Sequence, residues 1–484
     1  MRGSQAPNAV IDGQFLESDT GKRFDVTDPA TGAVVASVPD MGAAETRRAI
    51  EAADRALGAW RARTAQDRAD ILMRWYALIL DNQETLAQLL TAENGKPIAE
   101  SRGEVVYGAS FVRWYAEEAR RIYGDIIPTN KDGARILVLR QAIGVAAAIT
   151  PWNFPIATVT RKIAPGIAAG CTLVLKPAEQ TPLCAMALAE LGLEAGLPAG
   201  VLNVVTGADA AAIGGELTAN DTVRKLTFTG STEVGRLLMR QSAPSIKKLS
   251  LELGGNAPFI VFDDADLDTA VEAAMACKFR NAGQTCVCAN RIYAQDGIHD
   301  AFVAALAARV AAMQVGDGRG ATVEIGPLID TEVLAKVERH IADATSKGAE
   351  IRVGGARHAL GGTYYQPTLL TGAGPDMVLA REETFGPVAP VFRFRDEDEV
   401  VALANDTEYG LAAYFCATDL GRVWRVAEAL EYGMVGINSG LISNEIAPFG
   451  GVKHSGLGRE GSRYGIEEFT EMKYLHMGGI NRAA

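Results

Sequence analysis

The sequence is poor in cysteine and in long hydrophobic runs, and it has no excess of positive charge. Six cysteines among 484 residues are too sparse for a disulfide scaffold and are typical of a reducing compartment. A net charge of −12 leaves no basic stripe to neutralise phosphates, so we expect no nucleic-acid partner. No stretch reaches the roughly 18 apolar residues of a membrane span, and the polar N-terminus lacks a signal-peptide pattern. We therefore expect a cytoplasmic protein that binds neither membrane nor nucleic acid.

Histidine is also scarce, and this bears on metal binding. A structural zinc site needs four Cys or His ligands at suitable spacing. The five histidines are scattered and unpaired along the chain: His299, His340, His358, His454 and His476. The sequence supports neither a zinc site nor a Cys-His dyad, and we expect no metal.

Length and apolar content predict more than one domain. A chain of 484 residues, 48% of them hydrophobic, exceeds what one core usually fills. Residues 43–60 and 66–94 carry apolar positions at helical spacing, and Gly95-Lys96-Pro97 ends the second helix. From about residue 144, short apolar runs alternate with helical windows. We expect strands at 145–149, 171–175, 201–205, 225–228 and 249–253, with helices near 155–169, 182–194 and 209–218 between them.

The same alternation continues in the second half of the chain. Strand-helix-strand order of this kind implies a parallel sheet covered on both faces, as in Rossmann-type units. Two α/β domains joined near Gly254-Gly255 follow, and 124–142 and the C-terminal tail fit neither pattern. The second set of strands is expected near 257–262, 289–294, 388–394, 412–416 and 434–438, with helices at about 265–279, 299–313, 331–347, 397–404 and 420–430.

Two stretches indicate nucleotide binding. In "FTGSTEVG" (228–235), Gly230 and Ser231 follow a predicted strand and begin a helix, where a pyrophosphate is favoured. In "LKPAEQTP" (175–182), Lys176 and Glu179 follow another strand, and a carboxylate there can accept both hydroxyls of an adenosine ribose. An ordinary helix cap and a solvated ion pair remain the alternatives.

Two further strand ends carry groups suited to catalysis. In "LELGG", Glu252 precedes two glycines, so partial burial would raise its pKa toward the range of a general base. In "TPWNFP", Asn153 stands between two prolines, and a rigidly held amide can serve an oxyanion hole. The alternatives are a carboxylate that caps a turn and an Asn that forms one.

The stretch "NAGQTCVCANR" contains two cysteines one residue apart. Gly283 and Gln284 precede Cys286, which suggests a loop with an accessible thiolate held by backbone N–H groups. Cys288 is either a small buried residue or a resolving thiol for Cys286. Neither reading is excluded by the sequence.

Together these motifs resemble the aldehyde dehydrogenase superfamily over nearly the whole chain. "PWNFP", "LKPAEQTP", "FTGSTEVG", "LELGGNAP", "NAGQTC" and "EETFGPV" occur in the order of that family. The succinate-semialdehyde dehydrogenase subgroup is resembled through "KFRNAGQTCVCANR" and "GLISNEIAPFGGVKHSGLGREGSRYGIEE" (440–468). Ser439 departs from the residue that many members carry, which leaves the substrate open.

The resemblance implies a role for each matching residue. Cys286 would be the nucleophile, Glu252 the general base and Asn153 the oxyanion donor. Lys162 and Glu460 would move protons. Arg161, Arg280, Ser443 and Phe449 would bind the substrate. The cofactor residues would be Thr150, Pro151, Trp152, Lys176, Pro177, Glu179, Gly230, Ser231, Leu253, Glu383 and Phe385.

It also implies the fold and the reaction. The expected fold is α/β, with a Rossmann-type NAD-binding domain (1–123 and 143–253), an α/β catalytic domain (254–455) and a small oligomerisation element (124–142 and 456–484) of a homodimer or homotetramer. The expected reaction oxidises succinate semialdehyde to succinate through a cysteine thiohemiacetal and thioester. NAD is favoured over NADP, because Glu179 would repel a 2′-phosphate.

Several alternatives stay open. Glutarate semialdehyde is the next substrate, and an unspecific aliphatic aldehyde is the third, because one methylene changes binding by only about 1–3 kcal/mol. A coenzyme-A-acylating or phosphorylating relative is disfavoured by Glu252. A catalytically silent binding protein is disfavoured by the intact set of Cys286, Glu252 and Asn153.

Overall fold

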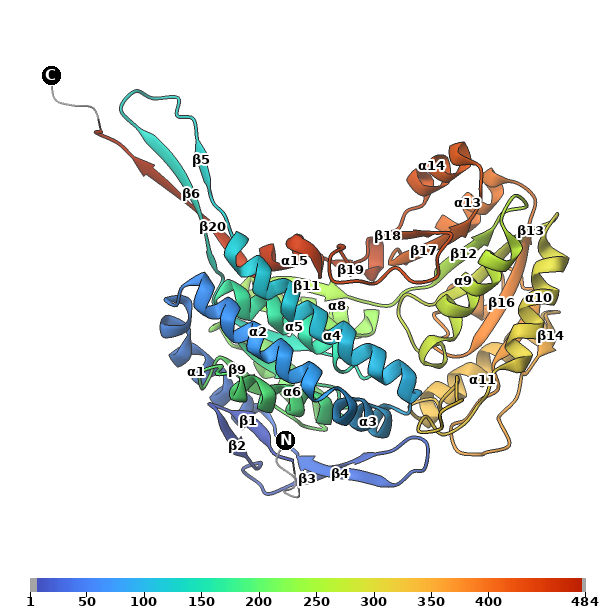
Figure 1. Cartoon of the computed structure of the whole chain (residues 1–484), viewed down its shortest axis with the longest axis horizontal. Helices are drawn as coiled ribbons and strands as arrows, with labels where there is room; N and C mark the ends of the chain where they lie inside the picture. Colours follow the sequence, from blue (N-terminus) through green and yellow to red (C-terminus); the bar gives the residue numbers. More distant parts are fainter. Residues whose placement is uncertain (1–6, 481–484) are drawn as a thin grey trace.

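The computed structural model describes residues 7–480, which form two large α/β units and a projecting arm (Figure 1). An eight-stranded sheet organises one half of the molecule and a seven-stranded sheet the other. A two-stranded ribbon of β3 (Arg23–Thr27) and β4 (Val34–Pro39) lies beside the first half. The α/β class expected from the alternating pattern is confirmed.

The first sheet has the strand order β19-β11-β10-β7-β8-β9-β1-β2. Its five central strands run parallel, and they match the five strands predicted from the apolar runs. The strands added at its two edges, β1 with β2 and β19, pair antiparallel. The bounds are β1 (Ala9–Ile11), β2 (Gln14–Leu16), β7 (Val145–Ile149), β8 (Thr172–Lys176), β9 (Leu202–Val204), β10 (Val223–Thr229), β11 (Lys248–Glu252) and β19 (Gly456–Leu457).

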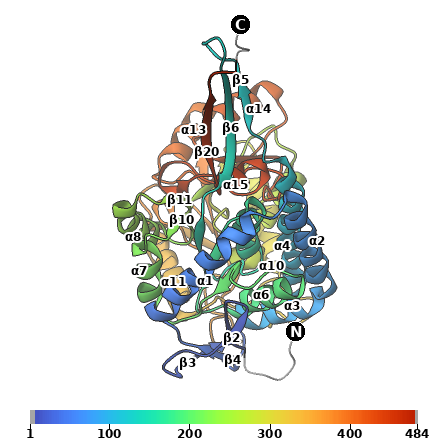
Figure 2. The ribbon, with the colours of Figure 1, turned by 90° about the vertical axis from the view of Figure 1, so that its left-hand side faces the viewer.

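Helices cover both faces of this sheet (Figure 2). Alternate residues of β7 point to opposite faces: Val145 and Ala147 join the core under one set of helices, and Ala146 and Ala148 join the core under the other. The first set contains α1 (Ala43–Arg61), α7 (Ala210–Ala219) and α8 (Thr232–Ser242). The second contains α2 (Ala65–Asp81), α3 (Gln83–Asn94), α4 (Ile98–Glu118), α5 (Ala157–Ala169) and α6 (Leu183–Glu194).

The second sheet has the order β14-β15-β16-β13-β12-β17-β18. Its strands are parallel except for β14 at one edge. The strands are β12 (Ala257–Val261), β13 (Ala289–Gln295), β14 (Glu350–Val353), β15 (Thr368–Thr371), β16 (Val388–Phe394), β17 (Ala412–Cys416) and β18 (Met434–Ile437). The helices are α9 (Leu267–Phe279), α10 (His299–Ala312), α11 (Thr331–Ser346), α12 (Val378–Arg381), α13 (Glu397–Asn405) and α14 (Leu420–Ala429).

A three-stranded arm projects from the body (Figures 1 and 2). It consists of β5 (Asp125–Ile127), β6 (Arg135–Ala142) and β20 (Thr470–Met477), in the order β20-β6-β5. The two segments that fitted no sequence pattern therefore pair with each other. Helix α15 (Ser462–Glu467) leads into the arm from the body.

One predicted helix is wrong in its continuity. The stretch 66–94 forms two helices, because α2 ends at Asp81 and α3 begins at Gln83. The Asn82 side chain donates a hydrogen bond to the Leu78 carbonyl, 2.8 Å away, and so satisfies the end of α2. Gly95 ends α3 in the left-handed conformation, as its position predicts. Between residues 7 and 480, no helix combines the length and the apolarity required to span a membrane.

Candidate active site

Cys286 lies in an irregular loop that joins α9 to β13. Asn281, Ala282 and Gly283 have positive φ angles of 51°, 54° and 74°, so the chain makes a tight left-handed turn before the cysteine. The Gln284 side chain accepts a hydrogen bond from the Ile329 N–H at 2.9 Å and anchors the turn. The sulfur is partly exposed and lines two cavities.

The first cavity is rich in groups that bind anions. Arg161 stacks over the Phe449 ring at 4.1 Å, and Arg280 lies over the Phe154 ring at 5.1 Å. Arg280 forms no ion pair with any residue in the described range. The four predicted substrate residues all line this cavity together with Asn153 and Cys286: Arg161, Arg280, Ser443 and Phe449.

The second cavity lies at the carboxyl ends of the first sheet's strands. Ser231 caps the N-terminus of α8 with its side chain, which accepts from the Val234 N–H at 3.3 Å. The Trp152 and Phe385 rings meet edge to face at 5.4 Å. Many of the predicted cofactor residues line it, including Pro151, Trp152, Gly230, Ser231, Leu253, Glu383 and Phe385.

Three other predicted cofactor residues lie at the end of β8. Lys176 donates to the Glu179 carboxylate at 3.1 Å and to the Pro177 carbonyl at the same distance. The Lys176 carbonyl accepts from the Thr150 N–H at 3.1 Å, which joins this turn to the segment before Asn153. These residues do not line either cavity around Cys286.

Glu252 is the last residue of β11, and its buried carboxyl group forms no hydrogen bond with the described chain. Its exposed fraction is 1%, and neither carboxylate oxygen has a hydrogen-bond partner in the described chain. Burial, and then repulsion from Glu460, raise its pKa well above the ordinary value, although Arg161 and Lys162 oppose the change.

Glu460 is buried beside Glu252 but is fully paired. It accepts hydrogen bonds from Arg161 Nε at 2.7 Å and from Lys162 Nζ at 2.5 Å. Burial acts to raise its pKa, but the two cations outweigh burial and leave the pKa below its ordinary value. The pKa values of the two neighbouring carboxyl groups therefore shift in opposite directions, because only Glu460 forms ion pairs with Arg161 and Lys162.

Asn153 connects the two halves of the site. Its side-chain Nδ2 donates to the Gln284 carbonyl at 3.1 Å. Its own carbonyl accepts from Lys96 Nζ at 2.7 Å and from Asn281 Nδ2 at 3.0 Å. The main chain and the side-chain amide of Asn153 are therefore both held in place. One of the two N–H protons of the side-chain amide remains for a ligand.

Both cysteines of the loop are free thiols. Burial raises the pKa of Cys286 to about 12, Arg161 and Arg280 lower it, and the carboxyl groups of Glu383 and Glu252 raise it. Burial outweighs the two arginines in this arrangement, and the accessible thiolate expected from the sequence stays a prediction. Cys288 is fully buried.

Glu383 lies in the loop before β16. Its carboxylate accepts from the Gly255 N–H at 3.1 Å, and burial raises its pKa to about 7. The next turn contains Phe385 with a φ of 57°, which is unusual for a residue with a side chain. This conformation directs the Phe385 side chain into the lining of the second cavity.

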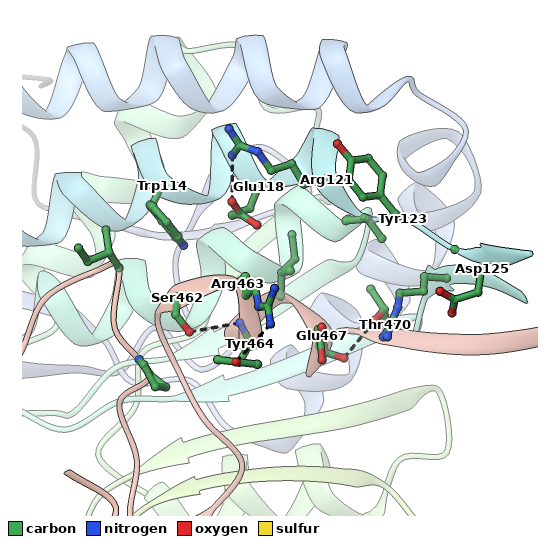
Figure 3. Close-up of a pocket in the computed structure, with 16 residues that line it drawn as sticks. Trp114, Glu118, Arg121, Tyr123, Asp125, Ser462, Arg463, Tyr464, Glu467 and Thr470 are labelled. Carbon is green, nitrogen blue, oxygen red and sulfur yellow. Dashed lines mark hydrogen bonds and ion pairs between the residues drawn. The ribbon is translucent and has the colours of Figure 1, made fainter. Parts of the chain in front are cut away.

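A third cavity, of about 640 Å³, lies at the root of the arm (Figure 3). The Arg121–Glu118 ion pair and residues of α15 surround it, and none of the predicted site residues lines it. No group of three His, Cys, Asp or Glu side chains within 7–480 is arranged to hold a metal ion. The chemistry of the molecule therefore concentrates around Cys286.

Several residues of the site escaped the sequence analysis. Tyr107 lines the first cavity, and its buried hydroxyl has no partner in the described chain. Thr229 lines both cavities, and its hydroxyl is likewise unpartnered. Helix α4, which carries Tyr107, was not predicted, so no local signal pointed to that residue. Thr229 could have been found, because it directly precedes Gly230.

Comparison with known proteins gives a consistent result. A family model described as "Aldehyde dehydrogenase family" matches residues 15–475. Glutarate-semialdehyde dehydrogenase of Pseudomonas aeruginosa is 63% identical over 472 residues, covering 98% of each chain. Succinate-semialdehyde dehydrogenase (NADP(+)) of Escherichia coli is 62% identical over 470 residues, covering 97% of each. The crystal structure of succinate-semialdehyde dehydrogenase from Burkholderia pseudomallei superposes with a TM-score of 0.97 at 60% identity, covering 98% of both chains.

Proposed function

The chain belongs to the aldehyde dehydrogenase family, and we propose that it oxidises a semialdehyde that carries a carboxylate, with succinate semialdehyde favoured. One observation carries the proposal: the Cys286 sulfur lies between a cavity with two arginines and a cavity at the carboxyl ends of parallel strands. The first can hold an anionic aldehyde, and the second can hold a nicotinamide dinucleotide.

The dinucleotide cavity has the donors and surfaces that such a cofactor needs. The N-terminus of α8 at Gly230 and Ser231 favours a pyrophosphate, and Glu383 can accept ribose hydroxyls. Trp152 and Phe385 offer aromatic edges, and the unpartnered Thr229 hydroxyl lines the same space. These residues would hold a nicotinamide dinucleotide beside Cys286, and the cofactor would supply the hydride acceptor for the oxidation.

The chain's own residues perform the acylation step. The Cys286 thiol loses its proton as its sulfur attacks the aldehyde carbon, which gives a thiohemiacetal. The negative oxygen formed there is stabilised by Asn153 Nδ2 and the Cys286 N–H. The thiol proton passes to solvent in the cavity during the attack.

Glu252 acts in the release of the acid. It takes a proton from the water that attacks the thioester carbon, and so it must first lose its own. The Glu460 carboxylate is the group proposed to receive that proton, and Lys162, which donates to it at 2.5 Å, stabilises its charge. A Cβ at Gly450 would lie 2.9 Å from Glu252 Oε1, so the glycine leaves this carboxyl group room to move.

The two arginines read the distal carboxylate of the substrate. Arg161 and Arg280 supply the charge, and Ser443 and the Tyr107 hydroxyl line the same cavity. Glutarate semialdehyde is the second candidate, because one relative with that printed name is 63% identical to this chain. The difference of one methylene corresponds to only about 1–3 kcal/mol.

NAD is the proposed cofactor, and NADP is tolerated. Glu179 disfavours a 2′-phosphate by charge, and no arginine follows it to compensate. The Lys176 ion pair partly neutralises Glu179 and so reduces this discrimination. The Escherichia coli relative carries NADP in its printed name, which supports the tolerance.

The remaining parts of the proposal concern organisation. Residues 1–123 and 143–253 form the NAD-binding domain, 254–455 the catalytic domain, and 124–142 with 456–484 an oligomerisation element. Exposed apolar side chains on the arm support self-association into a dimer or tetramer: Ile126, Ile127, Leu139, Met472, Tyr474, Leu475 and Met477. The protein acts in the cytoplasm.

A substrate panel tests the function. Succinate semialdehyde, glutarate semialdehyde and butanal are compared by kcat/KM with NAD, and we expect that order. A higher value for butanal than for both semialdehydes would remove the carboxylate from the proposal. No reduced cofactor with any aldehyde would overturn the activity itself.

A further inference from the structure

Three charged side chains, just before α4 and in its first two turns, contact the segment of Asn153 and the loop of Cys286, which together form the proposed oxyanion site. They are Lys96, Glu100 and Glu104, and none of them contacts the cavities around Cys286. Lys96 and Glu104 are buried, with exposed fractions of 1% and 4%. Burial of an ion pair costs free energy, so a pair in this position calls for a reason beyond folding.

Lys96 holds the main chain of Asn153. Its Nζ donates to the Asn153 carbonyl at 2.7 Å and to Glu104 Oε2 at 2.5 Å. The same ammonium lies 4.0 Å from the centre of the Phe154 ring. The backbone that carries the Asn153 amide is therefore fixed by a charged hydrogen bond.

Glu104 holds the next residues of the same segment. Its second oxygen, Oε1, accepts from the N–H groups of Ile156 and Ala157, at 2.9 and 3.2 Å. These are the first N–H groups of α5, which also carries Arg161 and Lys162. Glu104 therefore caps the helix that supplies the anion-binding and proton-relay residues.

Glu100 holds the other half of the oxyanion site. Its Oε2 accepts from the Asn281 N–H at 2.8 Å, within the left-handed turn that precedes Cys286. The Asn281 side chain then donates to the Asn153 carbonyl at 3.0 Å. Through these contacts α4 fixes the loop of the nucleophile and the segment of Asn153 to one another.

We propose that Lys96, Glu100 and Glu104 are positioning residues that set the separation between Asn153 Nδ2 and the Cys286 N–H. This inference rests on the proposed function, because it assigns those two donors to the oxyanion. Two donors separated by a chain of 133 residues need a common support, since a misplacement of about 1 Å can cost roughly 100-fold in rate. Helix α4 provides that support although its three charged side chains do not line the cavities around Cys286.

Glu93 provides a matched control. Like Glu104, it is a buried carboxylate that caps a helix: it accepts from the N–H groups of Leu183 and Cys184 at the start of α6, at 2.8 and 3.0 Å. It has no contact with the Asn153 segment or the Cys286 loop. Glu93→Gln should therefore change stability as Glu104→Gln does, but not the acylation rate.

The variants are Lys96→Met, Glu100→Gln, Glu104→Gln and Glu93→Gln in the full-length enzyme. For the first three, we expect the burst rate of NADH formation to fall by roughly 10- to 100-fold, with the KM for NAD within a few-fold of the parent. Alkylation of Cys286 by iodoacetamide forms no oxyanion, so its rate should stay unchanged in all four variants. A purely structural role would lower the melting temperature without separating these two reactions.

Each outcome decides the inference. Loss of aldehyde oxidation with intact alkylation in Glu100→Gln or Glu104→Gln supports it. An unchanged burst rate, or an equal loss in Glu93→Gln, overturns it. If Lys96→Met does not fold, the two Gln variants decide alone, because each keeps an oxygen acceptor at its site. A parent enzyme that produces no NADH with any aldehyde would instead overturn the proposed function.

Discussion

The Lys278 ammonium lies 3.3 Å from the sulfur of Cys288, and both side chains are fully buried. Burial raises the pKa of Cys288, and Lys278 acts in the opposite direction. Asn290 accepts a second hydrogen bond from Lys278 at 2.9 Å, which holds the ammonium in place. A cation beside a thiol stabilises its thiolate, and this is what a resolving cysteine requires.

Peroxide should inactivate the enzyme and dithiothreitol should restore it. The sulfenic acid formed on Cys286 is attacked by the Cys288 thiol, which gives a disulfide and water. Cys288→Ala should remain active but lose the recovery, because the sulfenic acid oxidises further. Activity after peroxide and then dithiothreitol measures this, with Cys416→Ala, a buried cysteine of the second sheet, as the control. Full recovery of Cys288→Ala would leave the second cysteine with a packing role only.

Glu252→Gln should separate acylation from release of the acid. The variant lacks the base, but Cys286 can still form the thioester. We expect a burst of NADH close to one equivalent per site, followed by turnover slowed by about 100-fold or more. Stopped-flow absorbance measures both phases. An unimpaired steady-state rate would mean that Glu252 is only structural.

Arg280→Ala should impair semialdehydes selectively. Loss of one partner of a desolvated charge pair costs about 2–5 kcal/mol of binding free energy. Butanal has no carboxylate, so its oxidation should not be affected in this way. The kcat/KM ratio of succinate semialdehyde to butanal measures the effect. Arg240→Ala, at an exposed position on α8, is the matched control and should leave the ratio unchanged. Equal losses for both substrates would assign Arg280 to folding.

The cofactor preference should depend on Glu179. The parent should have a higher kcat/KM with NAD than with NADP. Glu179→Gln should narrow the ratio by about tenfold, because the carboxylate no longer opposes a 2′-phosphate while Lys176 is released from its ion pair. Parallel assays with both cofactors test this. A parent that prefers NADP would contradict the prediction.

The burial of Glu252 should make stability depend on pH. Its folded-state pKa lies above the ordinary value of 4.5, so the folded protein binds a proton that the unfolded chain releases. Folding is therefore favoured most below the unfolded pKa, and stability falls as pH rises toward the folded value, by at most about 1.4 kcal/mol per pH unit. Glu252→Gln should remove this contribution. Its melting temperature should gain on the parent as the pH rises above the unfolded pKa of Glu252, and a constant difference would argue against a buried proton.

The sequence predicted the parallel strands of both sheets except β15, because the others follow short apolar runs. It did not predict β15 or the antiparallel edge strands such as β1 and β14, which are only three or four residues long and lie outside such runs. Helix α4 was also missed. The pairing of β6 with β20 joins segments more than 300 residues apart, and no local pattern contains that information.

The sequence predicted those site residues that belong to a motif at the end of a strand. Asn153 and Cys286 line the same two cavities, and Glu252, at the end of β11, lies close enough to Cys286 to affect its pKa. The sequence did not identify Lys96, Glu104 and Tyr107 as site residues. Their roles depend on contacts with residues far away in the sequence, such as Asn153 and Ile156. The raised pKa of Cys286 could not be predicted for the same reason, since burial and the approach of Glu383 and Glu252 come from distant segments.

The first sheet is completed by β19, whose Gly456 pairs with Glu252. The strand arrives about 200 residues after its neighbour, so the general base cannot reach its final surroundings until nearly the whole chain has been synthesised. Contacts between such distant segments form slowly, because the intervening chain must first be ordered. We therefore expect the surroundings of Glu252 to be completed late in folding.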